Sequence, residues 1–79
     1  MKACVRLFGT LPDYYPGTYP EKGLVVDIWE NISVAELVKL VNMSPDQVAI
    51  VAINGMLSKS HDIVPDGAEV KFFQPFNGG

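Results

Sequence analysis

The chain has 79 residues, a net charge of −3 and a pI of about 4.8, with 48% apolar and 19% charged residues. Its acidic balance without a run of Lys or Arg argues against nucleic acid and anionic membranes as partners, and its single cysteine excludes an internal disulfide framework and a zinc cluster of the usual spacing. No apolar run is long enough to span a bilayer and the first residues lack the hydrophobic region of a signal peptide, so we expect one cytoplasmic domain over residues 1–79.

Two strands open the predicted fold. Residues 2–8, KACVRLF, alternate in the manner of a strand, and residues 24–29, LVVDIW, form a second one. Residues 9–23 lie between them and hold three prolines and several other turn formers. This segment predicts a stiff loop folded over one end of the sheet, with its tyrosines as half-buried lids.

One helix is predicted, over residues 31–43. Ser33 is a natural N-cap, and Glu36 three residues later completes a capping box. Residues 44–47, SPDQ, repeat this start signal and predict a single turn. The apolar stripe that must pack on a sheet consists of Val34, Leu37, Val38 and Val41.

The second half of the chain predicts three more strands. Residues 48–53 form an apolar strand, and Asn54-Gly55 is the strongest short signal for a hairpin that leads into a short strand at 56–58. A Pro-Asp-Gly turn then precedes the last strand, at 68–73. The order is β-β-α-β-β-β. Because one helix can cover only one face of the sheet, we expect a two-layer α+β fold.

The face of the sheet away from the helix has no predicted cover. The residues expected to face the helix are Ala3, Val5, Leu7, Val51, Ile53, Val70 and Phe72. The opposite face then carries Cys4, Phe8, Ile50, Ala52 and Phe73. A bare apolar patch of this kind is usually a binding surface. The alternative is that the long first loop folds back over part of it.

No catalytic constellation is visible in the sequence. His61, the only histidine, lies in a polar segment and is predicted to be a solvated loop residue. Cys4, the only cysteine, lies in the middle of a strand and is predicted to be a small packed hydrophobe. No glycine loop for phosphate occurs. We therefore expect no enzyme, no bound metal and no bound cofactor.

The two glycines at the end of the sequence suggest a different role. Gly78 and Gly79 have no Cβ, so their backbone can approach another surface closely and thread a narrow tunnel. Such a flexible tail would deliver the carboxylate of Gly79 to a partner. A carboxylate is a poor acyl donor until it is activated, for example as an acyl-adenylate. The residues thus favour a carrier protein, in which partners bind the folded domain and the terminal carboxylate holds the cargo.

The ordered pattern of the C-terminal half resembles a known family. The run from VAING (51–55) through VPDGAEVKFFQPFNGG (64–79) is similar to the ThiS/MoaD sulfur carriers, and VRLFGTL (5–11) also fits. The resemblance implies a ubiquitin-like β-grasp fold, with a mixed four- to five-stranded sheet on one main helix. It also implies that an E1-like adenylyltransferase uses ATP to adenylate Gly79, and that a persulfide donor converts the adenylate to a thiocarboxylate.

The same resemblance implies a synthase catalytic subunit as the acceptor of the sulfur. It places Phe73 and Phe76 where the family has apolar partner contacts. Together with the uncovered sheet face and the tail, it gives the candidate partner-binding residues Phe8, Ile50, Phe73, Pro75, Phe76 and Asn77.

The tail FFQPFNGG (72–79) is closest to the MoaD-type small subunit of molybdopterin synthase, in which F-x-P-P before a short tail is common. Gln74 stands in place of the usual apolar residue or proline, and Phe76-Asn77 in place of a smaller pair. The alternatives are a carrier for thiamine thiazole synthesis, a ubiquitin-like modifier that joins lysines, and an interaction subunit whose Gly-Gly is incidental.

Overall fold

The structure is a computed structural model that describes residues 1–75. Five strands, one α-helix and one 3-10 helix follow one another along this part of the chain. They are β1 (Lys2–Leu7), η1 (Leu11–Tyr14), β2 (Leu24–Asp27), α1 (Val34–Leu40), β3 (Ile50–Ile53), β4 (Met56–Ser58) and β5 (Ala68–Phe73). The predicted order of strands and helix is confirmed, whereas η1 was not predicted.

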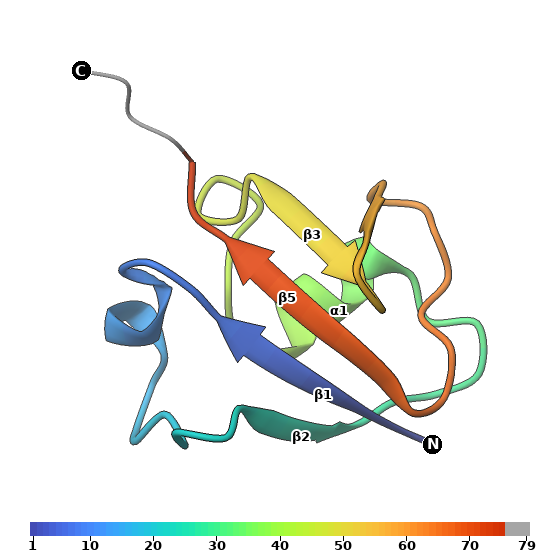
Figure 1. The fold of residues 1–79 in the computed structure, drawn as a ribbon, viewed down its shortest axis with the longest axis horizontal. Helices are drawn as coiled ribbons and strands as arrows, with labels where there is room; N and C mark the ends of the chain where they lie inside the picture. The colour runs from blue at the N-terminus through green and yellow to red at the C-terminus, as the bar shows by residue number, and fades with distance from the viewer. Residues whose placement is uncertain (76–79) are drawn as a thin grey trace.

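All five strands belong to one mixed sheet, in the order β2-β1-β5-β3-β4. β1 and β5 are parallel, and the other neighbours are antiparallel. Figure 1 shows β5, in orange-red, at the centre of the sheet between β1 and β3. Since β1 and β5 run the same way, Leu7 lies opposite Phe72. The exit from β5 therefore lies beside the loop that follows β1.

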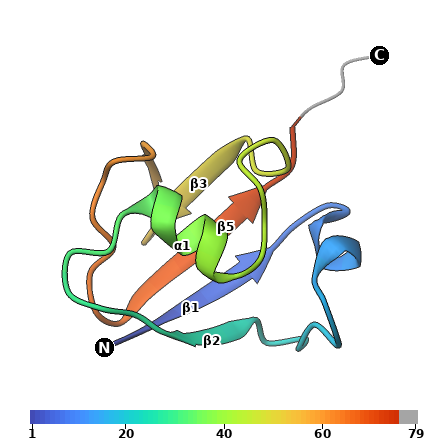
Figure 2. The ribbon, with the colours of Figure 1, turned by 180° about the vertical axis from the view of Figure 1, so that it is seen from behind.

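The helix α1 covers one face of this sheet (Figure 2). Its capping box is present: the Glu36 amide donates to Ser33 Oγ at 3.1 Å, and the Ser33 amide donates to Glu36 Oε1 at 3.0 Å. α1 is shorter than the predicted 31–43, because Asn42 takes a left-handed φ of 64° just after its last turn. The predicted apolar stripe is buried, as expected.

The core lies between α1 and the sheet. Phe72 and Val70 of β5 are fully buried, and the residues predicted to face the helix all belong to or pack against this core. Tyr15 and Tyr19 of the first loop pack against it, and the Tyr19 hydroxyl accepts a hydrogen bond from the Leu7 amide at 2.9 Å. The prediction of half-buried tyrosines is wrong for Tyr14, which is 58% exposed.

The predicted turns at Asn54-Gly55 and at residues 44–47 are confirmed. Asn54 and Gly55 both take positive φ angles, of 50° and 84°, as a two-residue hairpin requires. In the turn at residues 44–47, the Gln47 amide donates to the Ser44 carbonyl at 3.0 Å, and the Ser44 amide donates to Gln47 Oε1 at 2.9 Å.

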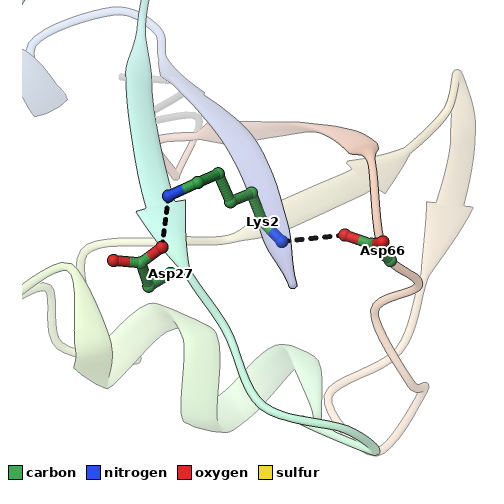
Figure 3. Close-up of polar contacts among 3 residues, drawn as sticks. All are labelled: Lys2, Asp27 and Asp66. Atoms are coloured by element: carbon green, nitrogen blue, oxygen red, sulfur yellow. Dashed lines mark hydrogen bonds and ion pairs between the residues drawn. The ribbon is translucent and has the colours of Figure 1, made fainter.

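Lys2 ties the start of β1 to two neighbouring segments (Figure 3). Its backbone amide donates to Asp66 Oδ1 at 2.8 Å, and its Nζ forms an ion pair with Asp27 at the end of β2. The hydrogen bond from Lys2, and then its positive charge, lower the pKa of Asp27 below the ordinary value of 3.8. Both side chains are exposed, so solvent screens the pair.

We expect Asp27→Asn to lower the free energy of unfolding slightly at neutral pH and not at all in strong acid. Because the folded-state pKa of Asp27 is lowered, its contribution is present above the unfolded pKa and is lost as the pH falls through the folded value. Urea denaturation at about pH 7 and about pH 2, in low and high salt, measures this. Asp13→Asn is the control, since Asp13 forms no ion pair among residues 1–75. A deficit that is equal at both pH values would contradict the assignment.

Candidate functional site

Three of the predicted partner-binding residues meet on the sheet face opposite α1. The rings of Phe8 and Phe73 are stacked, with centroids 5.0 Å apart and planes 18° from parallel. Ile50 pairs with Phe73 across β3 and β5 and is 47% exposed. These residues, here called the apolar cluster, lie at the ends of β1, β3 and β5 and share the face on which they were predicted to lie.

Backbone pairing fixes the apolar cluster in place. The Phe8 amide donates to the Phe72 carbonyl at 3.0 Å, which continues the parallel β1–β5 pairing by one residue and sets Phe8 beside Phe73. Successive side chains of a strand alternate between faces, so Phe73 points outward because Phe72 points into the core. The alternative of a loop folded over part of this face holds only at Cys4, whose Sγ lies 3.8 Å from the carbonyl of Lys22 at the end of the loop. Tyr15 and Tyr19 of the same loop pack against the core instead.

Ala52 and Leu57 change the predicted outline of this face. Ala52 was predicted to lie in the bare patch, but it is only 7% exposed. Its neighbours across β4 and β5 are Leu57 and Lys71, whose longer side chains shield its small one. Leu57 itself is 78% exposed and extends the apolar surface onto β4. It was missed because a three-residue strand shows too little alternation to assign a face.

Two basic side chains lie next to the apolar cluster. Arg6 of β1 and Lys71 of β5 lie opposite one another in the register. Each is two residues before a phenylalanine of the cluster, Phe8 or Phe73, and therefore lies on the same face. Neither forms an ion pair within residues 1–75. This acidic protein thus presents local positive charge beside its exposed apolar surface. The alternation of the two strands already indicated these positions, because Arg6 shares a face with Phe8, and Lys71 with Phe73, in the sequence pattern.

The segment that leads to the C-terminus begins at this cluster. Gln74 follows Phe73, and its Oε1 accepts hydrogen bonds from the backbone amide and the hydroxyl of Thr10. Pro75, a predicted partner-binding residue, is half-buried. A polar cavity of about 270 Å³ lies against this segment, between η1 and the turn at residues 44–47. The predicted site residues Phe76, Asn77, Gly78 and Gly79 lie outside the described residues.

The described residues offer little for catalysis or metal binding. His61 is exposed, as predicted, and Cys4 is half-buried with its Sγ 3.8 Å from the Lys22 carbonyl. Within residues 1–75, no three His, Cys, Asp or Glu side chains gather as metal ligands. None of the helices in that part of the chain has the length and apolar character needed to cross a membrane.

Comparison with known proteins supplies the family and the fold. The model of the ThiS family matches residues 5–79. Among solved structures, SAMP1 from Haloferax volcanii superposes with a TM-score of 0.72 at 20% identity, over 100% of both chains. A second structure, of H. volcanii small archaeal modifier protein 1, gives 0.70 at 19% identity, over 95% of this chain and 98% of that one. The predicted ubiquitin-like β-grasp fold is thereby confirmed. No curated protein matches the sequence significantly.

Proposed function

Because the chain belongs to the ThiS family, we propose that it is a sulfur carrier whose cargo is held on the carboxylate of Gly79. The family consists of small carrier proteins rather than enzymes. The observation that carries the proposal is the reach of the family match, which extends through Gly78 and Gly79. The exposed apolar cluster at the root of this segment supports it.

The proposed reaction activates a group that is otherwise inert. At neutral pH the terminal carboxyl group is ionised, and a carboxylate does not accept nucleophiles. An E1-like adenylyltransferase joins one carboxylate oxygen to the α-phosphorus of ATP and releases pyrophosphate. The terminal sulfur of a persulfide donor then attacks the carbonyl carbon and expels AMP. A thiol reduces the resulting acyl disulfide and leaves a thiocarboxylate on Gly79. We place this reaction in the cytoplasm, where ATP and reduced thiols are available.

The apolar cluster is the proposed docking surface for the activating enzyme. Aromatic side chains such as Phe8 and Phe73 are common anchors of protein interfaces, and Ile50 lies beside them with half of its surface exposed. Arg6 and Lys71 favour a partner that presents carboxylates next to an apolar patch, since opposite charges at the rim guide association. The synthase catalytic subunit that accepts the sulfur would use the same face after the activating enzyme has left.

The preferred acceptor pathway is molybdopterin synthesis. The support is the tail sequence FFQPFNGG, which resembles that of the small subunit of molybdopterin synthase. Thiazole synthesis for thiamine is the alternative acceptor, because it uses the same terminal chemistry.

Protein modification is the second candidate function. Both solved structures are of one Haloferax volcanii protein, small archaeal modifier protein 1 (SAMP1), which shares the fold along nearly the whole chain. A modifier would form the same adenylate and pass the carbonyl carbon to a lysine amine instead of to sulfur. High-mass conjugates that contain this chain in its native cell would favour the modifier. Their absence would favour the carrier.

The test of sulfur carriage is the intact mass of the protein after incubation with ATP, the E1-like enzyme of its native host and a persulfide donor. We expect a species heavier by one oxygen-to-sulfur exchange, sensitive to hydrolysis and located at Gly79 by fragmentation. Omitting ATP is the control, and it should leave the mass unchanged. An unmodified mass would contradict the proposal, provided that the same enzyme activates another carrier of that host.

A further inference from the structure

The contact between Gln74 and Thr10 continues the sheet where its backbone pairing ends. The parallel β1–β5 pairing reaches the hydrogen bond from the Phe8 amide to the Phe72 carbonyl. Beyond it, the Thr10 amide and hydroxyl both donate to Oε1 of the Gln74 side chain. A side chain thus takes the place that another backbone carbonyl would have in a longer strand, and it joins the start of the C-terminal segment to the loop after β1.

Gly9 leaves room for this contact. A Cβ at Gly9 would lie 2.5 Å from Gln74 Oε1 and 2.6 Å from its Cδ, distances that real Cβ atoms do not reach. Gly9 also has a φ of +64°, in the left-handed region that favours glycine. These atoms belong to the end of the exposed Gln74 side chain, so a Cβ at Gly9 would displace that side chain from Thr10. A glycine at this position is therefore compatible with the contact.

Pro75 restrains the same residue from the other side. Its ring fixes its own φ and keeps the backbone of the preceding residue in the extended region. Gln74 is therefore held through its side chain by Thr10 and through its backbone by Pro75.

We propose that Gln74 is a positioning residue, which fixes the direction in which the C-terminal segment leaves the sheet so that the carboxylate of Gly79 reaches the activating enzyme docked on the apolar cluster. This inference rests on the proposed function. Residues 76–79 can span at most about 13–14 Å, so a change in direction at Gln74 would displace the carboxylate of Gly79 over a comparable distance. Restraint at Gln74 lowers the entropy lost when the segment enters an active site.

The test compares Gln74→Ala with two other full-length variants in thiocarboxylate formation by the E1-like enzyme of the native host. We expect Gln74→Ala to lower kcat/KM about tenfold, the loss that one released backbone residue would cause. Gln74→Glu keeps an oxygen acceptor at the same reach, so we expect it to stay within about threefold of the native chain.

The matched control is Gln47→Ala. Gln47 Oε1 also accepts from a backbone amide, that of Ser44 at 2.9 Å, and Gln47 lines the same polar cavity, but it lies on a turn far along the chain from the C-terminal segment. We expect its kcat/KM to be unchanged. A readout that needs no partner is hydrogen exchange at the Thr10 amide, which should be faster in Gln74→Ala and unchanged in Gln47→Ala.

Three results would overturn the positioning role: native kcat/KM in Gln74→Ala, an equal loss in Gln47→Ala, or a Gln74→Glu variant as impaired as Gln74→Ala. The last would mean that the amide of Gln74 contacts the partner directly. Failure of the native chain to be activated would overturn the proposed function instead, and the positioning role with it. The two failures are therefore distinguishable.

Discussion

Deletion of Gly79 is expected to reduce thiocarboxylate formation by more than about a hundredfold, because it moves the reacting carboxylate back by one residue, about 3.3–3.6 Å. A displacement of this size removes the group from the reach of the ATP phosphate. We expect the fold to be unaffected, since within residues 1–75 the buried core extends only as far as Phe72. Intact-mass spectrometry measures the first effect, and thermal unfolding measures the second.

Gly79→Ala is the matched control for the deletion. It keeps the carboxylate at its position along the chain and adds only a Cβ, so we expect an activity between those of the native chain and the deletion. Charging of the shortened chain at the native rate would show that Gly79 is not the site of activation. It would leave the fold and the family assignment in place.

Phe72→Ala and Phe73→Ala are expected to have opposite consequences, although the residues are adjacent. Phe72 is fully buried, so its truncation should cost about 3–5 kcal/mol of the free energy of unfolding, a large fraction of the total for a small domain. Phe73 is half-buried on the outer face, so its truncation should cost about 1 kcal/mol in stability. Because Phe73 is a proposed anchor of the docking surface, its truncation should weaken binding to the activating enzyme about thirtyfold or more.

Urea denaturation and equilibrium binding to the purified activating enzyme distinguish the two variants. Binding is compared at a temperature at which both chains are folded, so that loss of structure does not imitate loss of affinity. Native affinity in Phe73→Ala would contradict the docking role of the apolar cluster. Native stability in Phe72→Ala would contradict the assigned inward face of β5.

The parts of the fold that depend on neighbours in the sequence were predicted well. The capping box of Ser33 and Glu36 and the hairpin at Asn54-Gly55 are closed by residues a few positions apart, so their residue types suffice to specify them. The ends of the elements were predicted less well. The helix ends before Asn42 because that residue turns left-handed, which the apolar periodicity could not reveal. The 3-10 helix η1 was missed because one turn in a proline-rich loop has no periodicity.

The candidate site was predicted in its residue types but not in its geometry. Strand alternation placed Phe8, Ile50 and Phe73 on one face, yet only the strand order β1-β5-β3 makes them neighbours. The burial of Ala52 depends on long side chains from two adjacent strands, so alternation alone predicted it wrongly. The contact of Thr10 with Gln74 joins residues 64 positions apart and had no local signal.

By itself, the sequence determined the family, the order of the elements, the inward and outward faces of the longer strands, and the glycine tail as the candidate cargo site. Each of these depends on residue type, on local hydrogen bonds or on periodicity over a few residues. Only the tertiary structure decided that the first and the last strand, β1 and β5, lie side by side as a parallel pair. This pairing assembles the apolar cluster and brings Thr10 to the side chain of Gln74. The physical reason is that strand pairing and side-chain shielding are long-range. They are set by which surfaces bury one another in the whole chain, and no short segment contains that information.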